Sequence, residues 1–287
     1  MAETWTIGRM IDWTAEYFER NNIPESRIDA EVLLSHVLDC PRLELYVKKD
    51  KELSKNDISK FKAFVIERKN RKPVSYITGE REFMGLKFKV NPHTLIPRPE
   101  TELLVEEVLK IVENSKAKLV IEIGTGSGNI AVSIAKLSPA VTVYSADSNI
   151  ETLRVAQANA DLNGVSDRVI LEHGNLFDAF KGECLEGKAD IIVSNPPYVA
   201  YSEKGLLAPE LLFEPQSALF GGDDGLDFYK AIMCDAGKYL KKGGYIAFEM
   251  NSAKSSQIQK IITDAGFKIE KVVNDYSGLE RIIIASK

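Results

Sequence analysis

Apolar residues recur at helical spacing through the first part of the chain. A first helix is predicted by the apolar positions Ile7, Met10, Ile11, Ala15 and Phe18. A second apolar pattern runs to Leu38, and a third helix is predicted to begin at Ser54, where Asp57 completes a capping-box pattern. This third helix ends in a basic run, residues 67–72, which we expect to be a solvated helix end; the alternative is a contact with a partner. These short amphipathic helices predict a small helical domain over residues 1–73 that docks a partner.

The pattern then changes to an alternation of apolar and polar residues with glycine turns. Between Val74 and Val90 this alternation, interrupted at Gly79 and Gly85, predicts a β-hairpin. A stiff, proline-containing stretch follows the hairpin. Residues 74–95 are therefore expected to form a β-hairpin linker between two domains.

Beyond residue 95, strand and helix patterns alternate to the end of the chain. The predicted strands are residues 119–123, 141–146, 169–171, 191–193, 245–248, 267–273 and 281–285. The predicted helices begin near Glu100 and cover about 129–136, 150–162, 226–240 and 255–265. Such alternation predicts a mainly parallel sheet covered on both faces, which makes residues 96–287 an α/β domain. The last two strands have no helix between them and are expected to pair antiparallel.

Composition and charge are those of an ordinary globular protein. The 287 residues are 44% hydrophobic and 28% charged. A net charge of −5 argues against a protein that wraps nucleic acid by charge alone. The polar first residues predict no signal peptide and no apolar run reaches membrane-spanning length, so we expect a cytoplasmic protein. No metal site is expected, because the cysteines and histidines are scattered: Cys40, Cys184, Cys234, His36, His93 and His173.

The most informative stretch is residues 190–198. A short apolar run, residues 191–193, predicts a buried strand that ends in Asn195-Pro-Pro-Tyr198. Neither proline has an N–H, so the sheet ladder stops and the chain forms a stiff elbow. Open α/β sheets bind their ligands at the carboxyl ends of the strands. A Pro-Pro pair alone is more often an ordinary loop, but this position after a buried strand favours a binding site.

The polar groups of the elbow suit a planar nitrogen that carries two hydrogens. The Asn195 side-chain oxygen and the Pro196 carbonyl can each accept one N–H, while Tyr198 covers the flat face. Holding both hydrogens directs the lone-pair density out of the plane. The elbow therefore predicts a site in which such a nitrogen attacks an electrophile.

A glycine-rich loop, Glu122-Ile-Gly124-Thr-Gly126-Ser-Gly128, follows the first strand of the α/β domain. Its glycines allow a tight turn and a close approach to a ligand. A dinucleotide fingerprint would need a glycine where this chain has Asn129. The spacing instead resembles the S-adenosylmethionine loop of class I methyltransferases, which implies cofactor binding by Gly124, Thr125, Gly126, Ser127 and Gly128. Glu122 would then hold the methionine end, directly or through water.

Two further polar residues follow the next strands. Asp147 is placed to accept hydrogen bonds from both ribose hydroxyls, and Asn175 to contact an adenine edge, with Leu176 or Phe177 against the ring. Taken singly, Asp147 could be a helix cap and Asn175 a turn residue. The glycine-rich loop, Asp147 and the elbow follow successive predicted strands in this order. This arrangement favours cofactor binding.

The combination resembles the HemK/PrmC family of protein-(glutamine-N5) methyltransferases over nearly the whole chain. The segments that carry the resemblance are 76–80 with Phe83, 95–102 (Leu-Ile-Pro-Arg-Pro-Glu-Thr-Glu), 124–128, 195–198, 213–219 (Phe-Glu-Pro-Gln-Ser-Ala-Leu), 221–225 and 275–281. The elbow is shared with adenine-N6 methyltransferases. The segments 95–102 and 213–219 are more particular to HemK-like proteins.

The resemblance implies a Rossmann-like class I methyltransferase sheet of seven strands, with the last strand antiparallel. It also implies methyl transfer from S-adenosylmethionine to the glutamine of the Gly-Gly-Gln loop of release factors, leaving S-adenosylhomocysteine. Asn195, Pro196 and Tyr198 are then expected to be catalytic, Pro197 to help bind the substrate, and Asn195 also to contact the cofactor. A monomer is expected, with neither a membrane nor a nucleic acid as partner. His93 is expected to be structural.

Two departures and three alternatives accompany this resemblance. Many relatives carry a glycine two residues after Glu249, where this chain has Asn251, which tolerates the left-handed conformation. Some relatives have an aromatic residue in place of Leu176. The alternatives are a glutamine methyltransferase of a ribosomal large-subunit protein, an amino-methyltransferase of adenine or guanine in nucleic acid, and a binding protein that has lost catalysis. The acidic chain and its small helical domain weigh against a nucleic-acid substrate.

Overall fold

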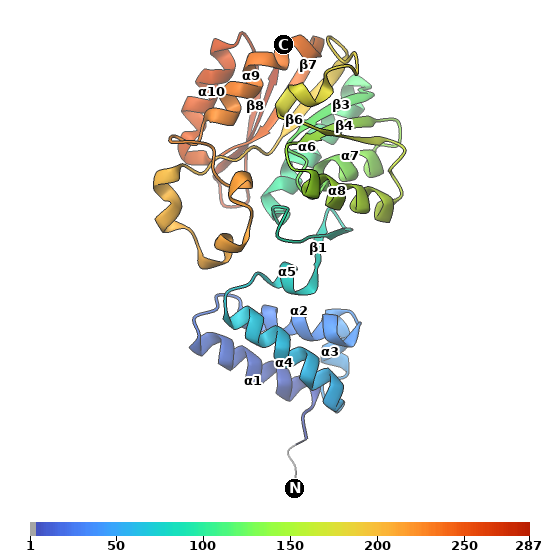
Figure 1. Ribbon diagram of the computed structural model, residues 1–287, viewed down its shortest axis with the longest axis vertical. Helices are drawn as coiled ribbons and strands as arrows, with labels where there is room; N and C mark the ends of the chain where they lie inside the picture. Colours follow the sequence, from blue (N-terminus) through green and yellow to red (C-terminus); the bar gives the residue numbers. More distant parts are fainter. Residues whose placement is uncertain (1–3) are drawn as a thin grey trace. The chain divides into compact units, whose positions relative to one another are not determined.

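The computed structural model describes residues 4–287, which form two compact units (Figure 1). One unit contains the chain up to Gly79 together with Ala208–Phe213, and the other contains Glu80–Leu207 with Glu214–Lys287. The first three residues of the predicted helical domain lie outside the described residues. No helix within residues 4–287 is long and apolar enough to cross a membrane.

The first unit is a helical bundle. Its helices are α1 (Ile7–Arg20), α2 (Ser26–Leu38), α3 (Arg42–Val47), α4 (Lys55–Lys69) and α5 (Val74–Thr78). Large apolar side chains from successive helices, including Phe18, Leu33 and Phe61, are almost completely buried and form its core. The predicted capping box at Ser54 and Asp57 is confirmed, and it fixes the start of α4.

Two predictions for this region are wrong. Helix α3 was not predicted, because six residues without a side-chain cap give little periodic signal. Residues 74–78 form helix α5 and not the first strand of a hairpin. Pro73 precedes the first turn of α5, and Gly79, at a φ of 77°, ends it in the left-handed conformation. The hairpin is shorter than predicted, with strands β1 (Glu80–Phe83) and β2 (Leu86–Lys89).

The basic end of α4 takes part in a buried ion-pair network. Arg68, 5% exposed, donates to Asp29 at 2.7 Å and to Glu210 at 3.0 Å, and Arg71 reaches Glu210 at 3.3 Å. Glu210 belongs to the segment Ala208–Phe213, which is far away in sequence but part of the same unit. The expectation of a simple solvated helix end is therefore wrong for these two arginines.

The second unit contains a seven-stranded sheet of order β5-β4-β3-β6-β7-β9-β8. Its strands are β3 (Leu119–Ile123), β4 (Thr142–Asp147), β5 (Val169–His173), β6 (Ala189–Ser194), β7 (Leu240–Glu249), β8 (Lys268–Asn274) and β9 (Glu280–Ser286). Strand β9 is antiparallel to both of its neighbours, whereas β3 to β7 pair in parallel. The predicted fold class and the antiparallel pairing of the last two strands are confirmed.

Helices cover both faces of this sheet (Figure 1). Helices α6 (Pro99–Ser115), α7 (Asn129–Leu137) and α8 (Ile150–Asn163) pack on one face, and α9 (Asp227–Tyr239) and α10 (Ser255–Asp264) pack on the other. The strand order reverses between β3 and β6. At such a switch point the loops that follow the two strands diverge, which leaves a crevice for a ligand.

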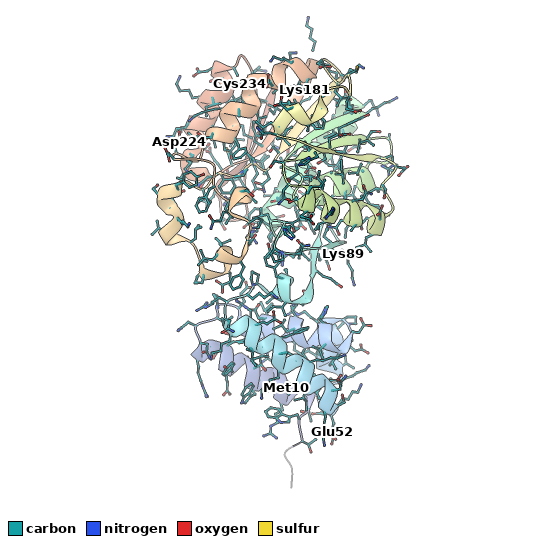
Figure 2. The ribbon with its side chains drawn as sticks, in the orientation of Figure 1. Met10, Glu52, Lys89, Lys181, Asp224 and Cys234 are labelled. Atoms are coloured by element: carbon teal, nitrogen blue, oxygen red, sulfur yellow. The ribbon has the colours of Figure 1, made fainter. Side chains whose placement is uncertain are left out.

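A buried asparagine helps to anchor the hairpin to the rest of the second unit. Asn159, on α8, accepts from the backbone N–H of Lys89 at 2.7 Å and donates to the Lys89 carbonyl at 2.9 Å (Figure 2 labels Lys89). The same side chain donates to the carbonyl of Ser127 in the glycine-rich loop at 2.8 Å. One fully buried amide therefore fixes both the hairpin and the loop.

Candidate active site

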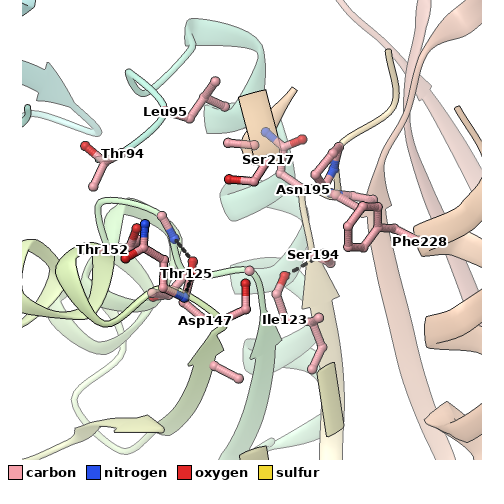
Figure 3. Close-up of a pocket in the computed structure, with 18 of the residues that line it drawn as sticks. Thr94, Leu95, Ile123, Thr125, Asp147, Thr152, Ser194, Asn195, Ser217 and Phe228 are labelled. Carbon is pink, nitrogen blue, oxygen red and sulfur yellow. Dashed lines mark hydrogen bonds between the residues drawn. The ribbon is translucent and has the colours of Figure 1, made fainter. Parts of the chain in front are cut away.

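A pocket lies at the carboxyl ends of the strands, at the switch point between β3 and β6 (Figure 3). It brings together residues predicted separately from the sequence: Gly124, Thr125, Gly126, Asp147, Asn175, Leu176, Asn195, Pro196 and Pro197. Four other predicted residues are not part of the pocket lining: Glu122, Ser127, Gly128 and Tyr198. The elbow and the glycine-rich loop thus border one cavity.

The glycine-rich loop connects β3 to α7, and its three glycines have positive φ. The N–H groups of Gly124 and Thr125 both donate to the carbonyl of Ala146, which ties the loop to the end of β4. A Cβ at Gly124 or Gly126 would meet open space among the described residues, whereas one at Gly128 would lie 3.2 Å from Ala156 on α8. The first two glycines therefore leave their backbone open to a ligand, and the third allows close packing.

Glu122 lies beneath this loop and is fully buried. Its Oε2 accepts from Thr125 Oγ1 at 3.0 Å and from Ser145 Oγ, while its Oε1 has no partner among the described residues. Burial raises the pKa of Glu122 to about 8. An unpaired carboxyl oxygen under the loop is a group that a polar ligand or a water molecule can satisfy.

Asp147 ends β4 and faces the pocket. Its two carboxylate oxygens accept from the N–H groups of Gly126 at 3.2 Å and Asn149 at 3.0 Å. Each oxygen keeps lone-pair capacity for a further donor, such as a hydroxyl group. Burial raises the pKa of Asp147 above its ordinary value, although these N–H groups oppose the shift.

The residues that follow β5 form the opposite wall. Asn175 and Leu176 line the pocket, whereas Phe177 is buried in the core and stacks on Tyr239 at 4.6 Å between ring centroids. Of the two residues proposed to face an adenine ring, only Leu176 is therefore in position. Leu176 has a φ of 50°, a left-handed conformation that costs a non-glycine residue about 1–2 kcal/mol.

The elbow begins directly after β6. Ser194 Oγ donates to the carbonyl of Ile123 at 2.6 Å, dashed in Figure 3, which fixes the end of β6 against the end of β3. The next residue, Asn195, is half-buried and donates from Nδ2 to Thr101 Oγ1 at 3.2 Å. The hydroxyl of Tyr198 donates to Glu249 Oε1 at 3.5 Å. The covering role of Tyr198 stays a prediction.

A glycine-rich segment, residues 221–225, packs against the back of the elbow. The N–H of Gly221 donates to the Val199 carbonyl at 2.9 Å, and Lys254 Nζ donates to the Tyr198 carbonyl at 2.9 Å. A Cβ at Gly221 would lie 2.3 Å from the carbonyl oxygen of Pro197, and one at Gly225 would lie 2.3 Å from that of Tyr198. These glycines are therefore required by close backbone approach, and the segment supports the elbow.

Substitution Gly221→Ala is expected to destabilise the protein by about 1–3 kcal/mol, because the added methyl group must displace the elbow backbone. The measurement is the free energy of unfolding in urea. Gly205→Ala is the matched control, since a Cβ there meets nothing within 4 Å among the described residues. Equal stability of the two variants would show that the elbow can move without cost.

The segment 95–102 contacts three other parts of the second unit. Arg98 Nη2 and the N–H of Ile96 both donate to Glu214, whose side chain is almost completely buried. Glu102 accepts from the N–H of Met84 at 2.6 Å, and Thr101 Oγ1 donates to Glu249 at 2.6 Å. The ion pair between Arg98 and Glu214 joins segment 95–102 to segment 213–219.

Several pocket residues were not predicted from the sequence. They are Thr101, Thr152, Pro215, Ser217, Ala218, Phe228 and Ile232. Thr101 and Pro215 lie within segments 95–102 and 213–219, which carry the resemblance, so a signal was present but no role was assigned to these two residues. Thr152 Oγ1 donates to the His93 carbonyl at 2.7 Å, and His93 itself is exposed and lines the pocket, so its structural role stays a prediction.

Asn251 does not adopt the left-handed conformation that an asparagine would tolerate. This residue has a φ of −77°, and its side chain accepts from the N–H of Ala253 at 3.0 Å. The asparagine caps a short 3₁₀ helix at the end of β7, so the position does not need a glycine-like backbone.

The fold and the arrangement of the pocket are those of a class I methyltransferase, the fold class that uses S-adenosylmethionine. Solved methyltransferases share this fold: one from Pyrococcus furiosus has a TM-score of 0.51 at 18% identity, covering 80% of this chain and 98% of that one. The catalytic domain of hMettl16, solved with an RNA hairpin, has a TM-score of 0.57 at 14% identity, covering 83% and 84%.

Sequence comparison defines the family. The families described as PrmC N-terminal domain and methyltransferase small domain match residues 9–79 and 99–276. The release factor glutamine methyltransferase of Geobacter sulfurreducens is 37% identical, covering 98% of this chain and 96% of that protein. That of Clostridium acetobutylicum is 38% identical and covers 90% of each. The chain belongs to the release factor glutamine methyltransferase family.

Proposed function

We propose that the protein methylates the side-chain amide nitrogen, N5, of the glutamine in the Gly-Gly-Gln motif of peptide chain release factors, in support of translation termination. The observation that carries the proposal is the orientation of Asn195. Its amide nitrogen is bound to Thr101, which leaves its oxygen as an acceptor at the pocket. A glutamine carboxamide is a planar nitrogen with two hydrogens, and it therefore matches the elbow.

The other end of the pocket fits S-adenosylmethionine. Gly124 and Gly126 have space where side chains would stand, and Asp147 keeps acceptor capacity for ribose hydroxyls. Asn175 is assigned to the adenine edge and Leu176 to its face, while the unpaired oxygen of Glu122 is assigned to the methionine end, through water or directly. When bound, the cofactor supplies an electrophilic methyl group on a sulfonium.

In the proposed reaction the protein acts mainly by positioning. The Asn195 oxygen and the Pro196 carbonyl each accept one hydrogen of the substrate amide, and Pro197 and Tyr198 complete the elbow. Two fixed hydrogen bonds define the plane of the nitrogen and turn its reactive face into the pocket, so proximity and orientation supply most of the acceleration. The amide nitrogen becomes acidic as its lone pair is engaged, and its proton leaves to water.

The helical unit is proposed to dock the release factor, and the enzyme to act as a monomer in the cytoplasm. The match of residues 9–79 to the PrmC N-terminal domain supports this assignment. The acidic net charge of −5 supports a protein and not a nucleic acid as substrate.

The test is methyl transfer from labelled S-adenosylmethionine. The acceptors are a release factor, its Gly-Gly-Gln→Gly-Gly-Ala variant, a ribosomal large-subunit protein, and DNA. Label is expected only in the intact release factor. Label in the Gly-Gly-Ala variant would mean that another residue is modified, and label only in the ribosomal protein would keep the chemistry and replace the partner. Label only in DNA would overturn the assignment of a protein substrate.

A further inference from the structure

Behind Asn195 lies a chain of hydrogen bonds that reaches a buried carboxyl group. Asn195 Nδ2 is 3.2 Å from Thr101 Oγ1, which is 2.6 Å from Glu249 Oε2. Thr101 and Glu249 are each 1% exposed, so neither bond competes with bulk water. The three residues come from the elbow, the first turn of α6 and the end of β7, and all belong to the second unit.

The direction of these bonds follows from the number of available protons. An ionised carboxylate can only accept, so the single hydroxyl proton of Thr101 must go to Glu249. The Thr101 oxygen can then only accept from Asn195, which requires the NH₂ group of that amide to face Thr101. The Asn195 oxygen is left facing the other way. Without this constraint, the two orientations of the amide would differ little in energy.

We propose that Thr101 and Glu249 are positioning residues, and that they set the orientation of the Asn195 amide so that its oxygen accepts an N–H of the substrate. This inference rests on the proposed function and extends it to Thr101, at the pocket wall, and to Glu249 behind it, both of which are proposed to act through Asn195. A turned amide would present NH₂ to the NH₂ of the substrate, and two donors repel.

The protonation state of Glu249 should control this orientation. A protonated Glu249 can donate to Thr101, which frees the Thr101 proton for the Asn195 oxygen and removes the constraint on the amide. Burial raises the pKa of Glu249 to about 7, so both forms are accessible near neutrality. The other ionisable groups that act on this carboxyl group come from neighbouring elements: Glu100, Tyr198, Tyr229 and Arg281.

The sign of the pH effect follows directly. Below a pH of about 7 the neutral form of Glu249 predominates, and the single-turnover rate of methyl transfer should fall as the pH decreases. Substitution Thr101→Val keeps the shape of the side chain but removes its hydroxyl. It should lower this rate about 10- to 100-fold and remove the acid limb of the pH profile, which is the decrease of the rate below about pH 7. Thr101→Ser keeps the hydroxyl and should stay within about threefold of the wild type with the limb intact.

Glu249→Gln offers an independent variant. Glutamine does not ionise, whichever end of its amide faces Thr101. The rate should therefore lose its decrease below about pH 7. All three variants should unfold cooperatively, with a lower melting temperature in Thr101→Val, because a buried carboxyl group loses a hydrogen-bond donor there. Their S-adenosylmethionine affinity, measured by calorimetry, should be close to wild type, since a general structural defect would change it.

A measurement independent of turnover separates this inference from the proposed function. The side-chain ¹⁵NH₂ signals of Asn195 are assigned by their loss in Asn195→Ala. In the wild type and in Thr101→Ser they should have the chemical shifts of an NH₂ group that is hydrogen-bonded in a single orientation. In Thr101→Val the signals should move to free-amide values. A wild type that labels no release factor would defeat the proposed function, and these signals would still decide the role of Thr101. Wild-type rates, pH profiles and amide signals in Thr101→Val would overturn the inference.

Discussion

Substitution Asn195→Ala is expected to lower the single-turnover rate of methyl transfer to a release factor by about 10²–10³-fold. The variant loses the acceptor that defines the plane of the substrate nitrogen, and removal of one preorganised hydrogen-bonding group at a reaction centre commonly has an effect of this size. The affinity for S-adenosylmethionine should change by less than about threefold, because the loop and Asp147 remain. The measurements are rapid-quench transfer and calorimetric binding.

The matched control is Asn251→Ala. Asn251 is also an asparagine in the second unit, but its side chain caps a short 3₁₀ helix and does not line the pocket. Its variant should turn over within about threefold of the wild type while losing about 1 kcal/mol of stability. A near-wild-type rate in Asn195→Ala would refute the proposed role of the elbow.

Substitution Glu122→Gln is expected to change how stability depends on pH. The pKa of Glu122 is raised to about 8 in the folded protein from an ordinary value of 4.5. The folded state therefore holds a proton that the unfolded state releases between these pH values, and the stability due to this group is lost as the pH rises through about 8. At about 1.4 kcal/mol per pKa unit, the part of this loss that falls between pH 5 and pH 8 is on the order of 4 kcal/mol.

Glutamine keeps an acceptor oxygen for Thr125 and Ser145 but does not ionise. Relative to the wild type, the variant should be more stable at pH 9 than at pH 5 by about that amount, measured as free energies of unfolding in urea. The control is Glu113→Gln, at an exposed position of α6. Its free energy of unfolding should depend on pH in the same way as that of the wild type. If the Glu122→Gln curve also runs parallel to it, the carboxyl group is not held neutral by burial.

The elements of the α/β domain could be predicted because each produces a local signal. The run of residues 119–123 and the glycines that follow it define β3 and the loop without any reference to the rest of the chain. The elbow is equally local, since two prolines stop a strand wherever it lies. The failure at residues 74–78 has the opposite cause: β-branched residues favour a strand, but Pro73 and Gly79 fix the ends of a helix turn.

The sequence by itself determined the fold class, the order of the strands and helices of the α/β domain, and the positions of the elbow and the loop, because these depend on residues close together in the chain. Only the tertiary structure decided that Thr101 donates to Glu249, 148 residues away, and that Arg98 donates to Glu214, 116 residues away. It also decided that Phe177 belongs to the core and Leu176 to the pocket. Side-chain hydrogen bonds and burial depend on which chain segments meet, and a pattern of neighbouring residues does not contain that information.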